Sequence, residues 1–122
     1  MSAIYISIFA VLGALSRYYL GYWIQKLYPD FPAGTLLINT MGSFFLALFM
    51  SLSLSRLVIS PEMRTGIAVG FFGSFTTFST FSYESFMLMS QGDYIRATLY
   101  VMLSVLLGIV SALLGFRIGE ML

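Results

Sequence analysis

The chain contains no cysteine and no histidine, and it has few charged side chains of either sign. Disulfides, thiolate nucleophiles, imidazole acid–base chemistry and the common zinc ligand sets are therefore all excluded. An enzyme would have to work with isolated carboxylates and hydroxyls, so the composition argues against catalysis. The formal net charge of +1 also provides no basic surface for binding nucleic acid.

The shortage of charge points instead to a membrane. Charged residues make up 9% of the 122 positions and hydrophobic residues 59%, whereas a soluble domain devotes about a quarter of its residues to charges. Uncharged runs cover residues 31–55, 65–83 and 97–116, and residues 1–25 are interrupted only by Arg17. About 20 helical residues cross a bilayer core of about 30 Å, so each run is close to one span in length. The sequence therefore predicts an all-α membrane protein.

Polar stretches divide these runs into four predicted transmembrane helices. Pro29 and Pro32 end the first helix, because proline blocks helix continuation. Residues 60–62 (Ser-Pro-Glu) are typical of a helix start, and residues 91–93 (Gln-Gly-Asp) of a turn. We expect a single domain over residues 1–122, with helices at about 2–25, 33–56, 61–90 and 94–119.

The basic residues give little indication of orientation. With four spans, both termini and the 56–64 loop share one side, which carries Arg56, Arg64 and Arg117. The other side carries Lys26 and Arg96, joined by Arg17 if its side chain snorkels that way. The positive-inside rule then has almost no asymmetry to act on. We predict that the chain inserts both ways up, although loop counts this small are also compatible with chance. An inverted second copy would supply the missing half of a transporter-like fold, so we expect an antiparallel homodimer.

The third predicted helix carries an unusual run, GSFTTFSTF, at residues 73–81. Gly66, Gly70 and Gly73 lie on one helix face, where small residues let another helix approach closely. Backbone at membrane depth can leave helical geometry only where it is buried in protein or lines water. Gly73 has free backbone torsions, and the hydroxyls that follow can bond freed backbone groups. We therefore predict a helix break near residues 73–77, with exposed carbonyls suited to a hard cation such as Na⁺.

Three segments carry a family resemblance: GFFGSFTTFSTF at 70–81, GTLLINTMGSF at 34–44 and GALSRYYLG at 13–21. The chain resembles the Fluc (CrcB) family of fluoride channels along all four predicted helices. The resemblance implies an antiparallel, dual-topology homodimer with two pores in the cell inner (plasma) membrane. It also implies passive, selective export of cytoplasmic fluoride, with a structural Na⁺ where the two broken third helices cross.

The resemblance also implies roles for particular residues. The fluoride pore would be lined by an amide, two phenylalanines and a set of hydroxyls: Asn39, Phe78, Phe81, Ser79, Thr80, Tyr100, Ser104 and Ser111. Backbone carbonyls of Gly73 and Thr76 would hold the Na⁺. The family's fourth helix carries a polar track spaced four residues apart, but here the step after Ser104 falls on Gly108, with Ser111 only nearby.

Three predicted positions keep alternatives. Arg17 would line an aqueous vestibule in the family, but it is also close enough to Lys26 to snorkel to the interface. Glu84 lies at the end of the phenylalanine face, and we expect it to accept hydrogen bonds, because a free carboxylate would repel an anion. It could instead simply face water. Tyr100 is equally compatible with an interfacial anchor.

Two other functions fit a small helical membrane protein. A dual-topology multidrug exporter has similar size, but it needs a membrane-embedded acid in its first helix, where this chain has Arg17 and no Asp or Glu. A non-transporting scaffold or accessory subunit would need helix packing but no polar cluster at 73–82. We therefore expect a channel whose partners are fluoride, lipid and a second copy of itself.

Overall fold

The computed structural model describes all residues from Met1 to Leu122 and contains helices but no strands. The long helices are α1 (Ser2–Leu27), α2 (Ala33–Ser55) and α6 (Tyr94–Met121). All three are long and apolar enough to cross a membrane. Their ends differ by one or two residues from those expected from the sequence. The all-helical fold is thus confirmed.

The stretch between α2 and α6 is divided into shorter pieces. They are α3 (Pro61–Thr65), the π-helix η1 (Gly66–Phe72), α4 (Gly73–Phe75) and α5 (Phe78–Ser90). Ser60 caps α3 by accepting a hydrogen bond from the Met63 N–H at 3.1 Å, as the Ser-Pro-Glu start predicts. The π-helix was not predicted from the sequence.

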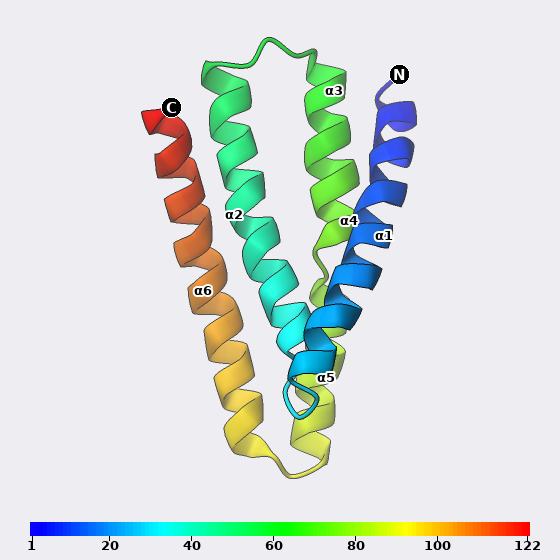
Figure 1. Cartoon of the computed structure of the whole chain (residues 1–122), viewed down its shortest axis with the longest axis vertical. Helices are drawn as coiled ribbons and strands as arrows, with labels where there is room; N and C mark the ends of the chain where they lie inside the picture. Colours follow the sequence, from blue (N-terminus) through cyan, green and yellow to red (C-terminus); the bar gives the residue numbers. More distant parts are fainter.

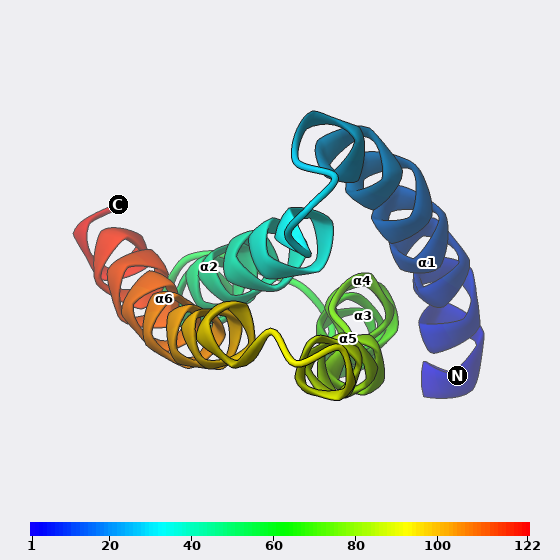
Figure 2. The ribbon, with the colours of Figure 1, turned by 90° about the horizontal axis from the view of Figure 1, so that it is seen from below.

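The elements alternate in direction along the long axis. α1 descends, α2 rises, α3 to α5 descend and α6 rises, so the N- and C-termini lie at the same end of the molecule (Figure 1). Seen from below, α1 packs on the α3–α4 segment, and α2 lies beside α6 (Figure 2). Both α2 and α6 start at the lower end of the molecule and rise, so these two helices run in the same direction.

The glycines of η1 form a packing face against α1. A Cβ atom on Gly70 would lie 2.7 Å from the Ile6 carbonyl oxygen, and one on Gly66 would lie 2.5 Å from the Tyr5 Cβ. Only glycine permits such close approach of the two backbones. The predicted packing role of these two glycines is confirmed. A Cβ atom on Gly73 would meet nothing within 4 Å, so Gly73 is not part of that face.

Candidate functional site

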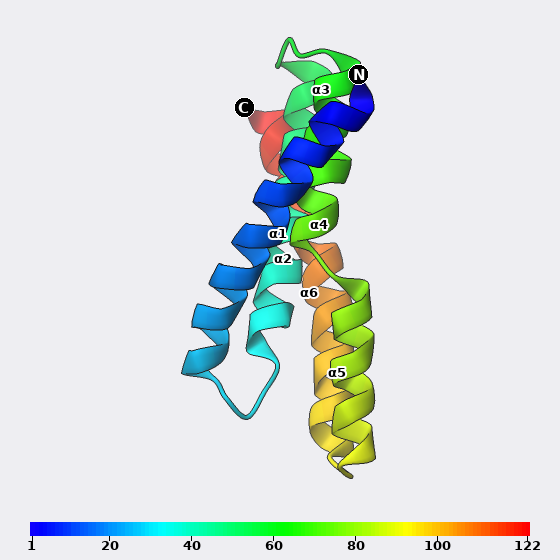
Figure 3. The same ribbon diagram turned by 90° about the vertical axis from the view of Figure 1, so that its right-hand side faces the viewer.

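The third helical stretch is interrupted at Thr76 and Thr77. Both residues have extended backbones, with φ −89° and ψ 159° at Thr76 and φ −150° and ψ 115° at Thr77. The chain steps sideways here between α4 and α5 (Figure 3). Gly73 is helical, with φ −63° and ψ −32°. The expected break at 73–77 is therefore narrower than predicted, and free torsions at Gly73 are not its cause.

Threonine side chains close both ends of the interruption. The Thr76 Oγ1 donates to the Phe72 carbonyl at 2.9 Å, at the end of α4. The Thr77 Oγ1 accepts from the Thr80 N–H at 3.2 Å and so caps the start of α5. It also donates to the Thr80 Oγ1 at 3.0 Å. Local hydroxyls thus satisfy part of the backbone that the break exposes.

Asn39, on α2, binds the extended backbone from the side. Its Nδ2 donates to the Thr77 carbonyl at 3.1 Å, and its Oδ1 accepts from the Thr77 N–H at 2.8 Å. The side-chain amide therefore takes the place of a neighbouring backbone at the break. Since Nδ2 has two protons and the Thr77 carbonyl takes one, the second remains available to a ligand.

Arg17, on α1, reaches the end of α4. Its Nε donates to the Ser74 carbonyl at 2.9 Å, and the Ser74 Oγ donates to the Ala10 carbonyl at 3.0 Å. The guanidinium is therefore bound at the break and does not extend toward Lys26, so the snorkelling alternative is wrong. Its positive charge lies where the carbonyls of a helix C-terminus point, which is favourable.

Two carbonyls at the break lose their helical donors. In a continuous helix the Gly73 carbonyl would accept from the Thr77 N–H, and the Thr76 carbonyl from the Thr80 N–H. The first N–H donates instead to Asn39 and the second to the Thr77 hydroxyl. Gly73 and Thr76 therefore present oxygen atoms that helical hydrogen bonds do not satisfy.

Glu84, on α5, is held by two hydroxyls from other helices. The Thr35 Oγ1 donates to Oε1 at 2.7 Å, and the Tyr100 hydroxyl donates to Oε2 at 2.9 Å. The prediction that Glu84 accepts hydrogen bonds is confirmed. Tyr100 is 0% exposed, so the alternative of an exposed interfacial anchor is wrong.

The phenylalanines near the break separate into two groups. Phe75 is buried and stacks on Phe71, with ring centroids 5.7 Å apart. Phe78 is 78% exposed, and its ring lies 5.7 Å from that of Phe81. The Phe81 ring in turn lies 5.2 Å from Tyr100. Phe78 and Phe81 therefore form a short aromatic row on α5, and Phe75 is not part of it.

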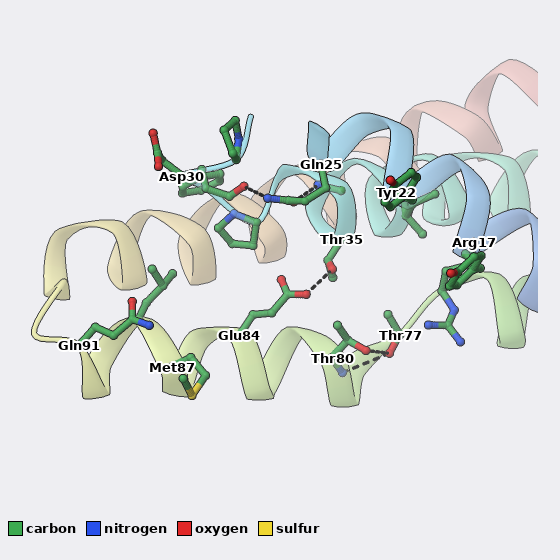
Figure 4. Close-up of a pocket in the computed structure, with 18 residues that line it drawn as sticks. Arg17, Tyr22, Gln25, Asp30, Thr35, Thr77, Thr80, Glu84, Met87 and Gln91 are labelled. Atoms are coloured by element: carbon green, nitrogen blue, oxygen red, sulfur yellow. Dashed lines mark hydrogen bonds between the residues drawn. The ribbon is translucent and has the colours of Figure 1, made fainter. Parts of the chain in front are cut away.

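A cavity of about 540 Å³ lies beside the break, between α1, α2 and α5 (Figure 4). Arg17, Thr77 and Thr80 lie at one end, and Glu84 lies further along it. The structure thus brings Arg17, Thr80 and Glu84 to one cavity. Ser79 is exposed outside it, with its hydroxyl 3.4 Å from the Thr77 Oγ1.

The remaining predicted hydroxyls lie on α6, outside this cavity. The Ser104 Oγ is buried and has no hydrogen-bond partner. Ser111 lies two turns further along α6, is partly exposed and makes no side-chain hydrogen bond. The predicted site residues therefore form two groups, one at the cavity beside the break and one along α6.

Comparison of the sequence with known proteins identifies the family of this chain. The family model described as CrcB-like protein, Camphor Resistance (CrcB), matches residues 4–116. The chain belongs to the CrcB family. Curated relatives of this CrcB chain include the fluoride-specific ion channel FluC of Geotalea uraniireducens (strain Rf4), which is 42% identical over 99% of the chain and 98% of the relative. The FluC of Geotalea daltonii is 44% identical over 93% of each chain. FluC 1 of Bacillus cereus (strain ATCC 14579) is 48% identical over 98% of the chain and 83% of the relative.

Two polar contacts of this CrcB protein were not predicted from its sequence: Thr35 is a partner of Glu84, and the backbone carbonyl of Ser74 accepts from Arg17. The prediction that hydroxyls after Gly73 bond backbone groups at the break is confirmed at Thr76 and Thr77. Thr35 lies four residues before Asn39, so both lie on one face of an uncharged helix, and that spacing could have identified it.

Proposed function

We propose that this chain is a fluoride-selective passive channel that exports cytoplasmic fluoride across the inner (plasma) membrane. Two observations support the proposal. Its relatives are named fluoride-specific ion channels. In an otherwise apolar chain, polar side chains of α1 and α2 bind the helix break, and polar side chains of α2, α5 and α6 meet at Glu84 in the adjoining cavity. No catalytic group is needed, and no energy source, because the negative cell interior drives the anion outward.

Passage of fluoride requires replacement of its water shell, since removing water from a small ion is costly. The donors would be the second Nδ2 proton of Asn39 and the hydroxyls of Ser79, Thr80, Tyr100, Ser104 and Ser111. The positive ring edges of Phe78 and Phe81 would add weaker contacts. A narrow path built of such neutral donors would reject chloride by its size.

Arg17 and Glu84, the two charged residues of the site, have different roles in this proposal. Arg17 would attract anions into the cavity, which serves as the vestibule. Glu84 would not repel them strongly, because Thr35 and Tyr100 each donate to one of its carboxylate oxygens. An anion that draws the Tyr100 hydroxyl toward itself would have to compete with Glu84 for that proton.

An inverted second copy would complete the site. Phe78 is 78% exposed, and Gly73 faces open space, both directly beside the break. If α3 to α5 together make a fourth crossing, both termini lie on one side and the basic residues are nearly balanced between the sides, which favours dual topology.

The absence of cysteine makes a clean test of dual topology possible. Single cysteines at Val58 and Gln91, in opposite loops, should each react partially with an impermeant maleimide on intact cells. Labelling of one loop alone would contradict dual topology.

The carbonyl oxygens at the break are suitable ligands for a structural Na⁺. The carbonyl oxygens of Gly73 and Thr76 are hard, neutral ligands without helical donors, and two copies would supply four of them. When bound, the ion would neutralise the carbonyl dipoles where the two breaks meet. Replacing Na⁺ by N-methylglucamine should lower the stability of the dimer, and an unchanged dimer would argue against the ion.

Efflux from liposomes that contain the purified protein tests the channel itself. Fluoride- and chloride-selective electrodes should record fast release of fluoride while chloride is retained. Absence of fluoride release from protein shown to be folded and dimeric would refute the proposal.

A further inference from the structure

The row of hydroxyls along α6 has a gap. Tyr100 and Ser104 are four residues apart, so they lie on one face of the helix, and the next position on that face is Gly108. Ser111 comes three residues later and is displaced around the helix. A dehydrated anion that moved along this face would therefore find no α6 side chain at the level of Gly108.

Ser43, on α2, lies opposite this gap. A Cβ atom on Gly108 would lie 3.8 Å from the Ser43 Oγ. The hydroxyl of Ser43 thus lies in van der Waals contact with the place where the side chain of a serine at position 108 would begin. In the resting chain it donates to the Asn39 carbonyl at 2.8 Å, the usual local bond of a serine in a helix.

The pairing of Ser43 with Gly108 is part of a longer register between the two helices. α2 and α6 run side by side in the same direction (Figures 1 and 2). A Cβ atom on Gly115, two turns beyond Gly108, would lie 3.2 Å from the Leu48 backbone nitrogen. In the other direction along the helices, the Thr35 and Tyr100 hydroxyls both reach Glu84. From Thr35 and Tyr100 to Ser43 and Gly108 each helix advances eight residues, so the helices are in step between these two levels. Beyond Gly108 they stay in contact, but α6 advances seven residues to Gly115 and α2 five to Leu48.

This register places two polar rows along one seam. One turn before the gap, Asn39 and Ser104 stand at the same level, and Ser104 has a buried hydroxyl oxygen with no partner. One turn earlier still, the Thr35 and Tyr100 hydroxyls meet at Glu84. Buried hydroxyls in proteins are normally hydrogen-bonded, and the Ser104 hydroxyl, which no protein acceptor takes, is free to donate to a ligand at this level.

We infer that Ser43 is a further fluoride-binding residue, which donates a hydrogen bond at the level of Gly108 in place of an α6 side chain. The inference rests on the proposed channel function. The hydroxyl would turn from the Asn39 carbonyl to the ion, because hydrogen bonds to an ionised acceptor are about twice as strong as those to a neutral one. The Asn39 carbonyl keeps its helical backbone donor, so the exchange leaves no buried group unsatisfied.

The test moves the hydroxyl from one helix to the other. In liposomes that contain the full-length protein, Ser43→Ala should slow fluoride efflux by about tenfold or more, the effect of losing one hydrogen bond to an ion. Adding Gly108→Ser to Ser43→Ala should restore most of the rate, because the new hydroxyl starts from a carbon only 3.8 Å from the place of the lost Ser43 hydroxyl. Adding Gly108→Ala instead supplies the carbon without the hydroxyl and should not restore it.

Ser55→Ala is the matched control, since Ser55 is exposed at the end of α2 and makes the same type of bond, to the Ser51 carbonyl at 2.7 Å. It should leave efflux unchanged. Elution volume and thermal unfolding identify any variant that fails to fold, and Ser43→Cys, which keeps the volume but donates weakly, then replaces Ser43→Ala. The inference is overturned if the Ser43 variants match wild type, or if serine and alanine at position 108 act alike. Failure of wild-type protein to release fluoride would instead refute the channel.

Discussion

Replacing Asn39 with alanine should destabilise the protein more than any neighbouring polar substitution on α2. The Asn39 side chain makes two hydrogen bonds to Thr77, of 3.1 and 2.8 Å, and the extended backbone there has no helical partners. Alanine would leave both the N–H and the carbonyl of Thr77 without those partners. Each unsatisfied buried group costs about 1–3 kcal/mol, so the free energy of unfolding should fall by roughly 2–6 kcal/mol. The membrane-protein average of about 0.6 kcal/mol per hydrogen bond sets a lower bound of about 1 kcal/mol.

Unfolding by SDS in mixed micelles measures this difference, and Thr40→Val is the matched control. Thr40 is adjacent on α2, but its Oγ1 donates only to the Leu36 carbonyl, at 2.8 Å, within the same helix. Removing this hydroxyl leaves the Leu36 carbonyl with its helical backbone donor, so the free energy of unfolding should fall by less than about 0.5 kcal/mol. Equal losses for the two variants would refute the idea that Asn39 holds the break open. Efflux of fluoride should also fall for Asn39→Ala and not for Thr40→Val.

Four further substitutions test the contacts around the break and along the helix that contains it. Arg17→Ala should lower the free energy of unfolding by about 1.5–3 kcal/mol, because the Ser74 carbonyl loses a charged donor. An unchanged free energy of unfolding in SDS would contradict that contact. Gly70→Ala should lower the melting temperature, because the added methyl group forces η1 away from α1. Gly73→Ala should leave the stability of the monomer unchanged but weaken dimerisation, measured by cross-linking. A larger loss of monomer stability for Gly73→Ala than for Gly70→Ala would contradict the packing. Glu84→Ala should slow fluoride efflux and destabilise, since two hydroxyl donors lose their acceptor; wild-type behaviour would remove Glu84 from the site.

The helices could be predicted from the sequence because their signals are local. Uncharged runs, proline positions and the Ser60 cap depend only on neighbouring residues, and the observed ends agree within one or two positions. The π-helix could not be predicted, because it forms where Gly66 and Gly70 allow α1 to approach. That approach depends on which helices become neighbours.

The sequence predicts the break in the right region, but only part of the predicted cause is correct. Hydroxyls do bond backbone groups at the break, at Thr76 and Thr77. Gly73, in contrast, is helical, and the interruption is stabilised at Thr77 by Asn39 from α2. Arg17, from α1, binds the carbonyl just before it. Contacts between residues so far apart in the sequence leave no local pattern. Glu84 shows the same limit, since hydrogen bonding was predictable but its partners were not.

The most direct test of the central claim is the zero-current voltage of the purified protein in a planar bilayer. Fluoride is placed on one side and chloride on the other, with the same cation on both. If the polar break forms a fluoride-selective path, current is carried by fluoride and the zero-current voltage moves far toward the fluoride equilibrium potential. A voltage near zero, or current that persists with chloride alone, would contradict the account.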